Sequence, residues 1–180
     1  ISIEGMMLMA SMVAAIVGSV TKNPWLGLLG GILSSILLAL ILGVLSIKYK
    51  VNQTISGTVI NIFSAGLTAF ISQKFRQHAP LLNTPKLFPR VPIPGLASIP
   101  LIGPILFNQN LFVYLMFVIL IVLQLALFET RWGLRLRSVG EHPKAADTLG
   151  INVIRTRYMG VILSGLVAGI AGSFFTLGSV

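Results

Sequence analysis

Five apolar runs, nearly free of charged side chains, dominate the hydrophobic pattern of the chain. A helix that crosses the hydrocarbon core of a bilayer needs about 20 mostly apolar residues. Runs of that order predict membrane-spanning helices near residues 3–20, 25–47, 53–73, 111–128 and 158–178. The expected fold class is therefore all-α, a polytopic transmembrane helix bundle forming a single domain over residues 1–180.

Small residues recur at every fourth position in the second and last predicted spans. Because lipid supplies no hydrophobic force between helices, small side chains at this spacing favour close contact of helix backbones. The span 111–128 is instead bulky and free of glycine, which predicts a position on the outside of the bundle. The small-residue lines are Gly27, Gly31, Ser35, Ala39 and Gly43, and then Gly160, Ser164, Ala168, Gly172 and Thr176.

Polar side chains follow one face of the third predicted span. Polar groups inside a membrane usually face the bundle interior or a watery cavity. One interpretation is a path for a neutral, hydrogen-bonding solute; the other is packing, with hydroxyls bonded to carbonyls of their own helix. Both stay open for the threonines, whereas Asn61 favours the path, because its own helix backbone cannot satisfy an amide fully. The candidate substrate-path residues are Asn52, Gln53, Thr54, Thr58, Asn61 and Thr68.

The segment 129–157 is a polar island that holds six of the thirteen Lys and Arg residues and three of the four acids. Within it, Pro143 and Gly150 bracket a short helical segment, since proline suits the first helical position and glycine the residue after the last. A short, separately punctuated helix between two membrane spans is expected to dock a soluble partner.

The distribution of Lys and Arg predicts the orientation. The segment 129–157 and the turn at 48–52 share one side and carry eight Lys and Arg, against five on the other side. Cytoplasmic loops are richer in these residues, so 129–157 is expected to be cytoplasmic. The segment 74–110 is then external; it holds seven of the nine prolines, which exclude a spanning helix there.

Composition narrows the function classes further. Charged residues make up only 9%, against about 25% in soluble domains. The net charge of +9 comes without a basic patch interleaved with aromatic side chains, so nucleic acid is not an expected partner. No phosphate-binding loop, serine elbow or carboxylate pair in a span is present, which predicts a protein that is not an enzyme. The chain starts at Ile1 and stops at Val180 within apolar sequence, so a fragment of a longer protein is expected.

Glu4 is the only acid outside the 129–157 segment. A carboxylate within the membrane could bind a cation or proton. A carboxylate at the start of a helix could instead cap it, because the helix dipole favours negative charge there. The sequence favours the capping role.

Several blocks of the sequence resemble the membrane permease subunits of ABC importers for nucleosides and simple sugars, within the branched-chain amino acid and ribose permease superfamily. The blocks are IEGMMLMA at 3–10, NPWLGLL at 23–29, VNQTISGTVINI at 51–62, GPILFNQN at 103–110, WGLRLRSVGEHPKAADTLGINVIRTRYMG at 132–160 and LSGLVAGIAG at 163–172. They occur in order along nearly the whole chain.

This resemblance implies an ATP-driven importer of a nucleoside or simple sugar in a bacterial inner membrane, with a coupling helix that docks an ATPase subunit. The implied partners are that ATPase, which carries ATP and Mg, a second permease subunit and an external substrate-binding lipoprotein; no cofactor is expected on this chain. The family's Glu-Ala-Ala…Gly signature is altered here, because an acid follows the two alanines. The candidate coupling residues are Glu141, Pro143, Ala145, Ala146, Asp147 and Gly150.

Two other functions remain open at this point. An ion-coupled secondary transporter would need ionisable groups within the membrane and broken helices, and only Glu4 is a candidate. A membrane scaffold that recruits a soluble protein would explain the 129–157 segment, but it would leave the polar face of the third span without a role.

Overall fold

The computed structural model describes residues 2–78, 87–88, 90–92 and 108–178. All five predicted spans are helices, each long and apolar enough to cross a membrane, and the all-α prediction is confirmed. The spans are α1 (Ile3–Thr21), α2 (Pro24–Gly43) with its π-helical continuation η1 (Val44–Lys48), α3 (Gln53–His78), α5 (Leu111–Phe128) and α8 (Val153–Leu177).

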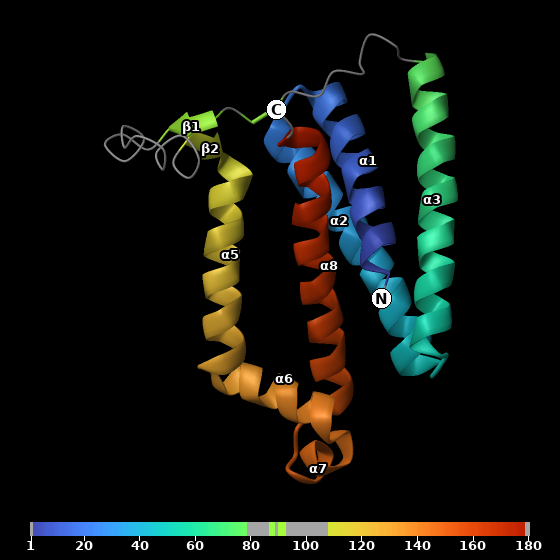
Figure 1. Ribbon diagram of the computed structural model, residues 1–180. Helices are drawn as coiled ribbons and strands as arrows, with labels where there is room; N and C mark the ends of the chain where they lie inside the picture. Colours follow the sequence, from blue (N-terminus) through green and yellow to red (C-terminus); the bar gives the residue numbers. More distant parts are fainter. Residues whose placement is uncertain (1, 79–86, 89, 93–107, 179–180) are drawn as a thin grey trace.

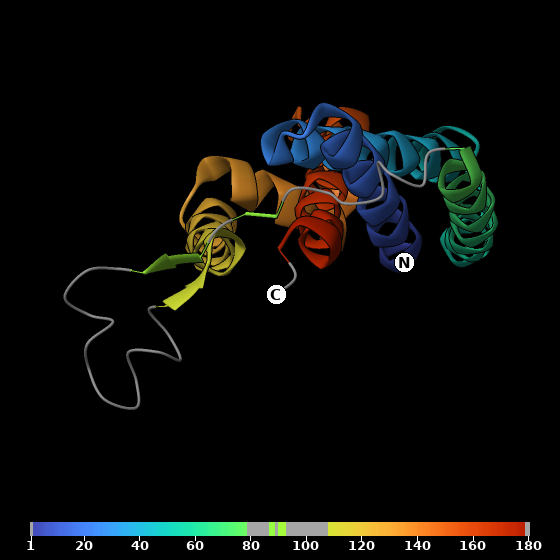
Figure 2. The same cartoon turned by 90° about the horizontal axis from the view of Figure 1, so that it is seen from above.

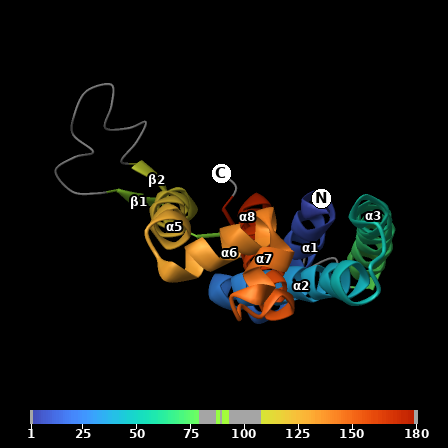
Figure 3. The same ribbon diagram turned by 90° about the horizontal axis from the view of Figure 1, so that it is seen from below.

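Four of the spanning helices stand side by side in a row, in the order α5, α8, α1, α3 (Figure 1). Helix α2 runs along one side of this row, as the views from above and below both show (Figure 2, Figure 3). Its contacts with α1 and α8 are the most extensive in the structure. Helix α6 (Arg131–Glu141) lies across the lower ends of the helices in Figure 1, and the short α7 (Pro143–Thr148) lies beyond it.

Side-chain caps explain where several helices begin. At each of these starts an Asn or Thr oxygen accepts a backbone N–H that has no partner within the first turn, which favours helix initiation. The cap residues and the N–H donors are Asn23 with Trp25, Asn110 with Phe112, Thr130 with Gly133, and Asn152 with Arg155.

The predicted small-residue line of α2 is buried along its whole length. The residues near the start of the line pack against α1: a Cβ on Gly27 would lie 2.8 Å from the Ala14 carbonyl oxygen. Residues further along pack against α8, where the Ser35 hydroxyl donates to the Gly165 carbonyl over 2.7 Å. Residues spaced four apart shift gradually around a helix that has 3.6 residues per turn, so the same line of residues contacts two neighbouring helices.

The predicted small-residue line of α8 is wrong at its start. Ser164 is exposed, and a Cβ on Gly160 would meet only the Leu136 side chain. The contact with α2 follows a mixture of three- and four-residue steps, which keeps it on one side of a straight helix. The buried small residues of α8 are Gly165, Ala168, Gly169, Gly172 and Ser173.

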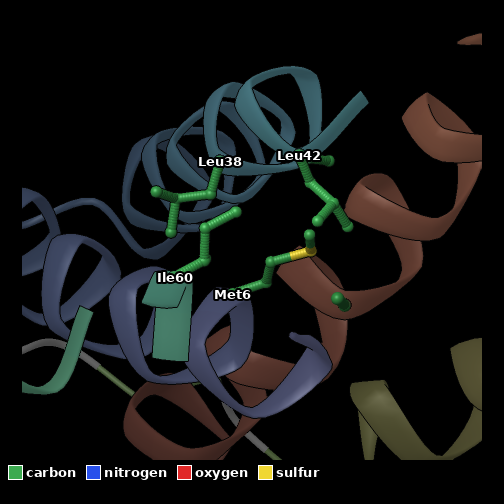
Figure 4. Close-up of a cluster of buried hydrophobic side chains, with 6 residues drawn as sticks. Met6, Leu38, Leu42 and Ile60 are labelled. Atoms are coloured by element: carbon green, nitrogen blue, oxygen red, sulfur yellow. The ribbon is translucent and has the colours of Figure 1, made fainter. Parts of the chain in front are cut away.

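A compact apolar cluster joins α1, α2 and α3 on the α2 side of the row. Met6 of α1 and Ile60 of α3 point toward Leu38 and Leu42 of α2 (Figure 4), and all four side chains are buried. The cluster fixes which way α1 and α3 are turned about their axes.

Helix α5 stands apart from the other spans, as its composition predicts. Only 6% of its 18 residues are buried. At one end it is tied to α8 through the Asn110 amide, which donates to the Gly178 carbonyl over 2.9 Å. The Phe112 ring meets the Phe88 ring edge-on there, with 5.2 Å between centroids. At the other end it continues into α6.

The predicted external, proline-rich segment 74–110 is shorter in the structure, because its first residues belong to a helix. Helix α3 continues to His78, and the strands β1 (Arg90–Pro92) and β2 (Asn108–Asn110) form an antiparallel pair. This pair lies beside the upper end of α5 in Figure 1, whereas α6 and α7 lie at the lower ends of the helices. Residues 79–86, 89 and 93–107 are outside the described residues, and so is most of the predicted external segment.

Candidate functional site

The predicted short helix exists as α7, and it protrudes from the bundle (Figure 1). Pro143 occupies its first turn, and Ala146 is buried against the chain with 2% exposure. Leu149, at the opposite end, is 80% exposed. One buried residue therefore anchors α7, while a large apolar side chain projects from it into the surroundings.

Backbone hydrogen bonds terminate α7 in a Schellman motif. The Ile151 N–H donates to the Ala146 carbonyl over 3.1 Å, and the Gly150 N–H donates to the Asp147 carbonyl over 2.9 Å. This pairing requires a left-handed residue after the last helical turn, and Gly150 has a φ of 78°. The positive φ gives Gly150 a specific structural role, since other residues adopt it at a cost of about 1–2 kcal/mol.

The six candidate coupling residues lie together around α7 but differ in exposure. Ala145, Asp147 and Gly150 are exposed, and Glu141 is exposed at the end of α6. Pro143 is half-buried, and Ala146 faces inward. The four exposed residues are accessible to a partner, while Ala146 holds the helix in place.

The polar face of α3 divides into two parts. Thr54 and Thr58 are exposed, and the Thr58 hydroxyl donates to the Thr54 carbonyl over 3.0 Å. Thr68, further along, contacts the sulfur of Met9 on α1 at 3.9 Å. Asn52 is exposed, and its side chain accepts the Thr54 N–H over 2.9 Å, so it caps the start of α3.

Asn61 joins α3 to the first turn of α1. Its side-chain oxygen accepts the Gly5 N–H over 2.9 Å. A Cβ on Gly5 would come within 2.9 Å of the Asn61 Cα, so the two backbones nearly touch. Sequence periodicity missed this pairing, because nothing in it specifies which helix lies opposite.

Gln53 lines a cavity of about 520 Å³ at the α7 end of the bundle. The walls come from α1, η1, α6 and α8, and they include the polar side chains of Ser46, Arg157 and Ser164. Sequence reasoning missed these three residues, since Ser46 and Arg157 lie at the ends of spans and Ser164 was assigned to helix packing. No three His, Asp or Glu side chains come together as a metal site anywhere in the described part of the chain.

Helix α6 was also missed, although the sequence carries a signal for it. Trp132, Leu136 and Val139 follow helical spacing, and Thr130 caps the first turn through the Gly133 N–H. Val139 is 2% exposed and faces the cavity described above. The helix turns the chain from α5 toward α7 and α8.

Comparison with known proteins identifies the chain over its full length. Residues 1–180 match the family described as branched-chain amino acid transport system / permease component. The chain is 40% identical over 153 residues to the guanosine ABC transporter permease protein NupQ of Bacillus subtilis, covering 84% of this chain and 48% of that protein. It is 41% identical over 163 residues to the nucleoside ABC transporter permease protein NupC of Lactococcus lactis, covering 90% and 50%.

A third relative is the putative glucose ABC transporter permease protein TsgC13 of Haloferax volcanii, 35% identical over 179 residues, covering 98% of this chain and 54% of that protein. The chain thus spans about half the length of these relatives. No solved structure matches it. The full-length family match, together with five helices suited to crossing a membrane, shows that the chain is a multi-pass membrane protein belonging to the family of branched-chain amino acid transport system permease components.

Proposed function

We propose that this chain forms part of the permease subunit of an ATP-driven ABC importer that carries a nucleoside across a bacterial inner membrane. Two of the relatives described above are named for guanosine or nucleoside transport, and a third for glucose. The polar face of α3 suits a neutral solute rich in hydrogen-bonding groups, because it presents hydroxyls and amides and no charge. A simple sugar has the same chemistry and is the second solute class.

The observation that carries this proposal is the construction of α7. It protrudes at the end of the molecule that also holds Lys48 and Lys50, the basic turn expected in the cytoplasm. A Schellman motif fixes its end, and Leu149 and Asp147 are exposed on it. An exposed apolar side chain beside a carboxylate is suited to a groove on a soluble partner, and we assign that partner as the ATPase subunit.

In this proposal ATP and Mg are bound by the ATPase, and a second permease subunit and an external substrate-binding lipoprotein complete the importer. Glu141, Ala145 and Asp147 contact the ATPase, while Gly150 maintains the end of α7. Hydrolysis on the ATPase moves α7, and through α6 and α8 it moves the spans that border the solute path.

Co-purification of the full-length permease with its ATPase tests the coupling role. Gly150→Val should reduce the recovered ATPase at least about tenfold, because the branched side chain disfavours the left-handed conformation of the Schellman motif. Asp147→Arg should reduce it similarly by reversing an exposed charge. Membrane insertion should be unchanged in both variants.

Two matched controls distinguish this role from general damage. Gly140 on α6 has open space around it, as Gly150 has, but lacks the positive φ, so Gly140→Val should retain the ATPase. Glu129→Arg should do so as well, since that exposed carboxylate lies away from α7. Failure of the wild-type permease to bind any ATPase would overturn the proposal in favour of an ion-coupled transporter or a scaffold.

A further inference from the structure

The corner between α5 and α6 is closely packed (Figure 1). The Thr130 hydroxyl bridges the two helices, because it donates to the Ala126 carbonyl of α5 and accepts the Gly133 N–H of α6. A Cβ on Gly133 would overlap the Ala126 carbonyl oxygen, so α6 lies directly against the end of α5. The Arg137 guanidinium carbon lies 4.8 Å from the centroid of the Phe128 ring, a cation–π contact across the corner. These contacts fix the angle between the two helices.

Asn110, which caps the start of α5, ties the opposite end of this helix to α8. Its buried amide donates to the Gly178 carbonyl over 2.9 Å and to the Phe88 carbonyl over 3.5 Å. The Phe88 N–H in turn donates to the Leu177 carbonyl over 3.0 Å, and the Phe112 ring lies edge-on to the Phe88 ring. Because buried polar groups are costly to leave unpaired, these bonds fasten the start of α5 to the end of α8.

Between these two joints, α5 and α8 are separated by an apolar cavity of about 270 Å³. Met116 and Ile119 of α5 are among its walls, and so are Val167 and Ile170 of α8. The view from above likewise shows α5 apart from α8 (Figure 2). Because the cavity leaves few close contacts between the two helices along this stretch, a tilt of α5 relative to α8 costs little dispersion energy.

Helix α6 connects α5 to α7, and a single residue, His142, lies between α6 and α7. The His142 N–H donates to the Ser138 carbonyl over 2.9 Å, and its own carbonyl accepts the Ala146 N–H over 3.0 Å. Leu136, midway along α6, lies against α8, since a Cβ on Gly160 would be 3.3 Å from its side chain. Helix α8 itself is packed against α1 and α2. A displacement of α7 is therefore passed to α6, which can pivot on α8.

We propose that α5 and α6 form a rigid strut that carries movement of α7 to the opposite end of the membrane layer. Thr130 and Asn110 are the positioning residues at its two joints. With 18 residues, α5 is about 27 Å long, close to the roughly 30 Å thickness of a hydrocarbon core, so one stiff element spans most of that layer. An importer has to change its external side in response to ATP hydrolysis in the cytoplasm, and rigid-body movement of packed elements achieves this. The inference rests on the coupling role proposed above for α7.

The ratio of guanosine uptake to ATP hydrolysis, measured on the complete importer in vesicles with internal ATP, tests the strut. Thr130→Val removes the bridging hydroxyl and keeps the shape of the side chain. It should lower this ratio at least about fivefold, because without the bridging hydrogen bonds α6 turns without α5. Recovery of the ATPase with the permease should be unchanged. Asn110→Ser keeps an oxygen that can cap α5 but removes the amide donor to Gly178, and it should lower the ratio similarly.

Thr130→Ser keeps the hydroxyl and should retain most of the wild-type ratio. Thr156→Val is the matched control and should keep the full ratio, since the Thr156 hydroxyl donates to the Asn152 carbonyl at the start of its own helix. An unchanged ratio in Thr130→Val or in Asn110→Ser, or equal losses of uptake and hydrolysis in either variant, would overturn the strut while the coupling role of α7 stands. A wild-type permease that recovers no ATPase, or shows no ATP-dependent guanosine uptake, would instead contradict the proposed function itself.

Discussion

Glycine and serine determine how closely the central helices approach. A Cβ on Gly165 would lie 2.6 Å from the Ala39 Cβ and 3.2 Å from the Ile36 Cα, and one on Gly169 would lie 2.7 Å from the Ile32 Cα. These distances are shorter than ordinary contacts between carbon atoms, at about 3.5–4.0 Å. The contact between α2 and α8 therefore exists only because these positions carry no side chain.

Gly165→Ala should destabilise the bundle by about 1–3 kcal/mol, because the added methyl group forces α8 away from α2. Thermal unfolding of the purified protein in detergent would measure the loss. Gly66→Ala is the control: a Cβ there meets nothing within 4 Å, so the higher helix propensity of alanine should stabilise α3 by up to about 1 kcal/mol. An equal effect of the two changes would refute the packing explanation.

Single residues also show where prediction from sequence stops. The composition of α2 predicted its small-residue line correctly, because both of its neighbours pack on that line. On α8 a strict four-residue spacing led to Ser164, which is exposed, while the contact lies at Gly165. For Asn61 the sequence indicated a polar residue inside the membrane, but its partner, the Gly5 N–H, depends on which helix lies opposite.

Two helices stand apart from the packed spans: α5 is largely exposed, and α7 protrudes from the bundle. α7 was predictable because Pro143 and Gly150 mark its ends locally, without reference to the rest of the fold. α6 was not recognised, although Trp132, Leu136 and Val139 follow helical spacing, and its orientation across the row depends on α5 and α8. The π-helical turn η1 left no sequence signal, and it lies at the end of α2, before the turn into α3.

The exposure of α5 predicts how it responds to polar substitution. Leu120, near its middle, is 60% exposed. Leu120→Arg should reduce insertion of α5 by about 3–4 kcal/mol on the biological insertion scale, because a centrally placed charge faces hydrocarbon. Leu120→Ala removes contacts with few neighbours and should change unfolding by less than about 0.5 kcal/mol.

A glycosylation-based insertion assay would measure the first change and thermal unfolding the second. Normal insertion of the Leu120→Arg variant would show that this face of α5 is covered by protein or water and would contradict its exposure to lipid.

For the whole molecule, the structure separates the two sets of loops to opposite ends. η1, α6 and α7 share one end, and β1, β2 and the last turn of α3 share the other (Figure 1). For the described residues this agrees with the grouping used for the charge count, in which eight Lys and Arg are expected on one side and five on the other; Lys86, one of the five, lies outside the described residues. That count predicts that the α7 end faces the cytoplasm.

Residues 1–180 contain no cysteine, so single cysteines introduced among them can test this orientation. Lys144→Cys and Lys50→Cys should react with a membrane-impermeant maleimide only in inverted vesicles. Arg76→Cys should react only from the outside of intact cells. All three positions are exposed, so a missing reaction reflects sidedness rather than burial. Labelling of Lys144→Cys in intact cells would reverse the assigned orientation.

The hydrogen bond between Ser35 and Gly165 joins residues 130 positions apart. At about 5–20 residues per second, a ribosome needs roughly 7–26 s to make the intervening chain. Throughout that interval the part of the α2 small-residue line that contacts α8 in the final structure lacks α8, although α1 is already beside α2. The order of synthesis therefore creates a waiting period for the growing chain, during which lipid or an insertion factor has to occupy the place of α8.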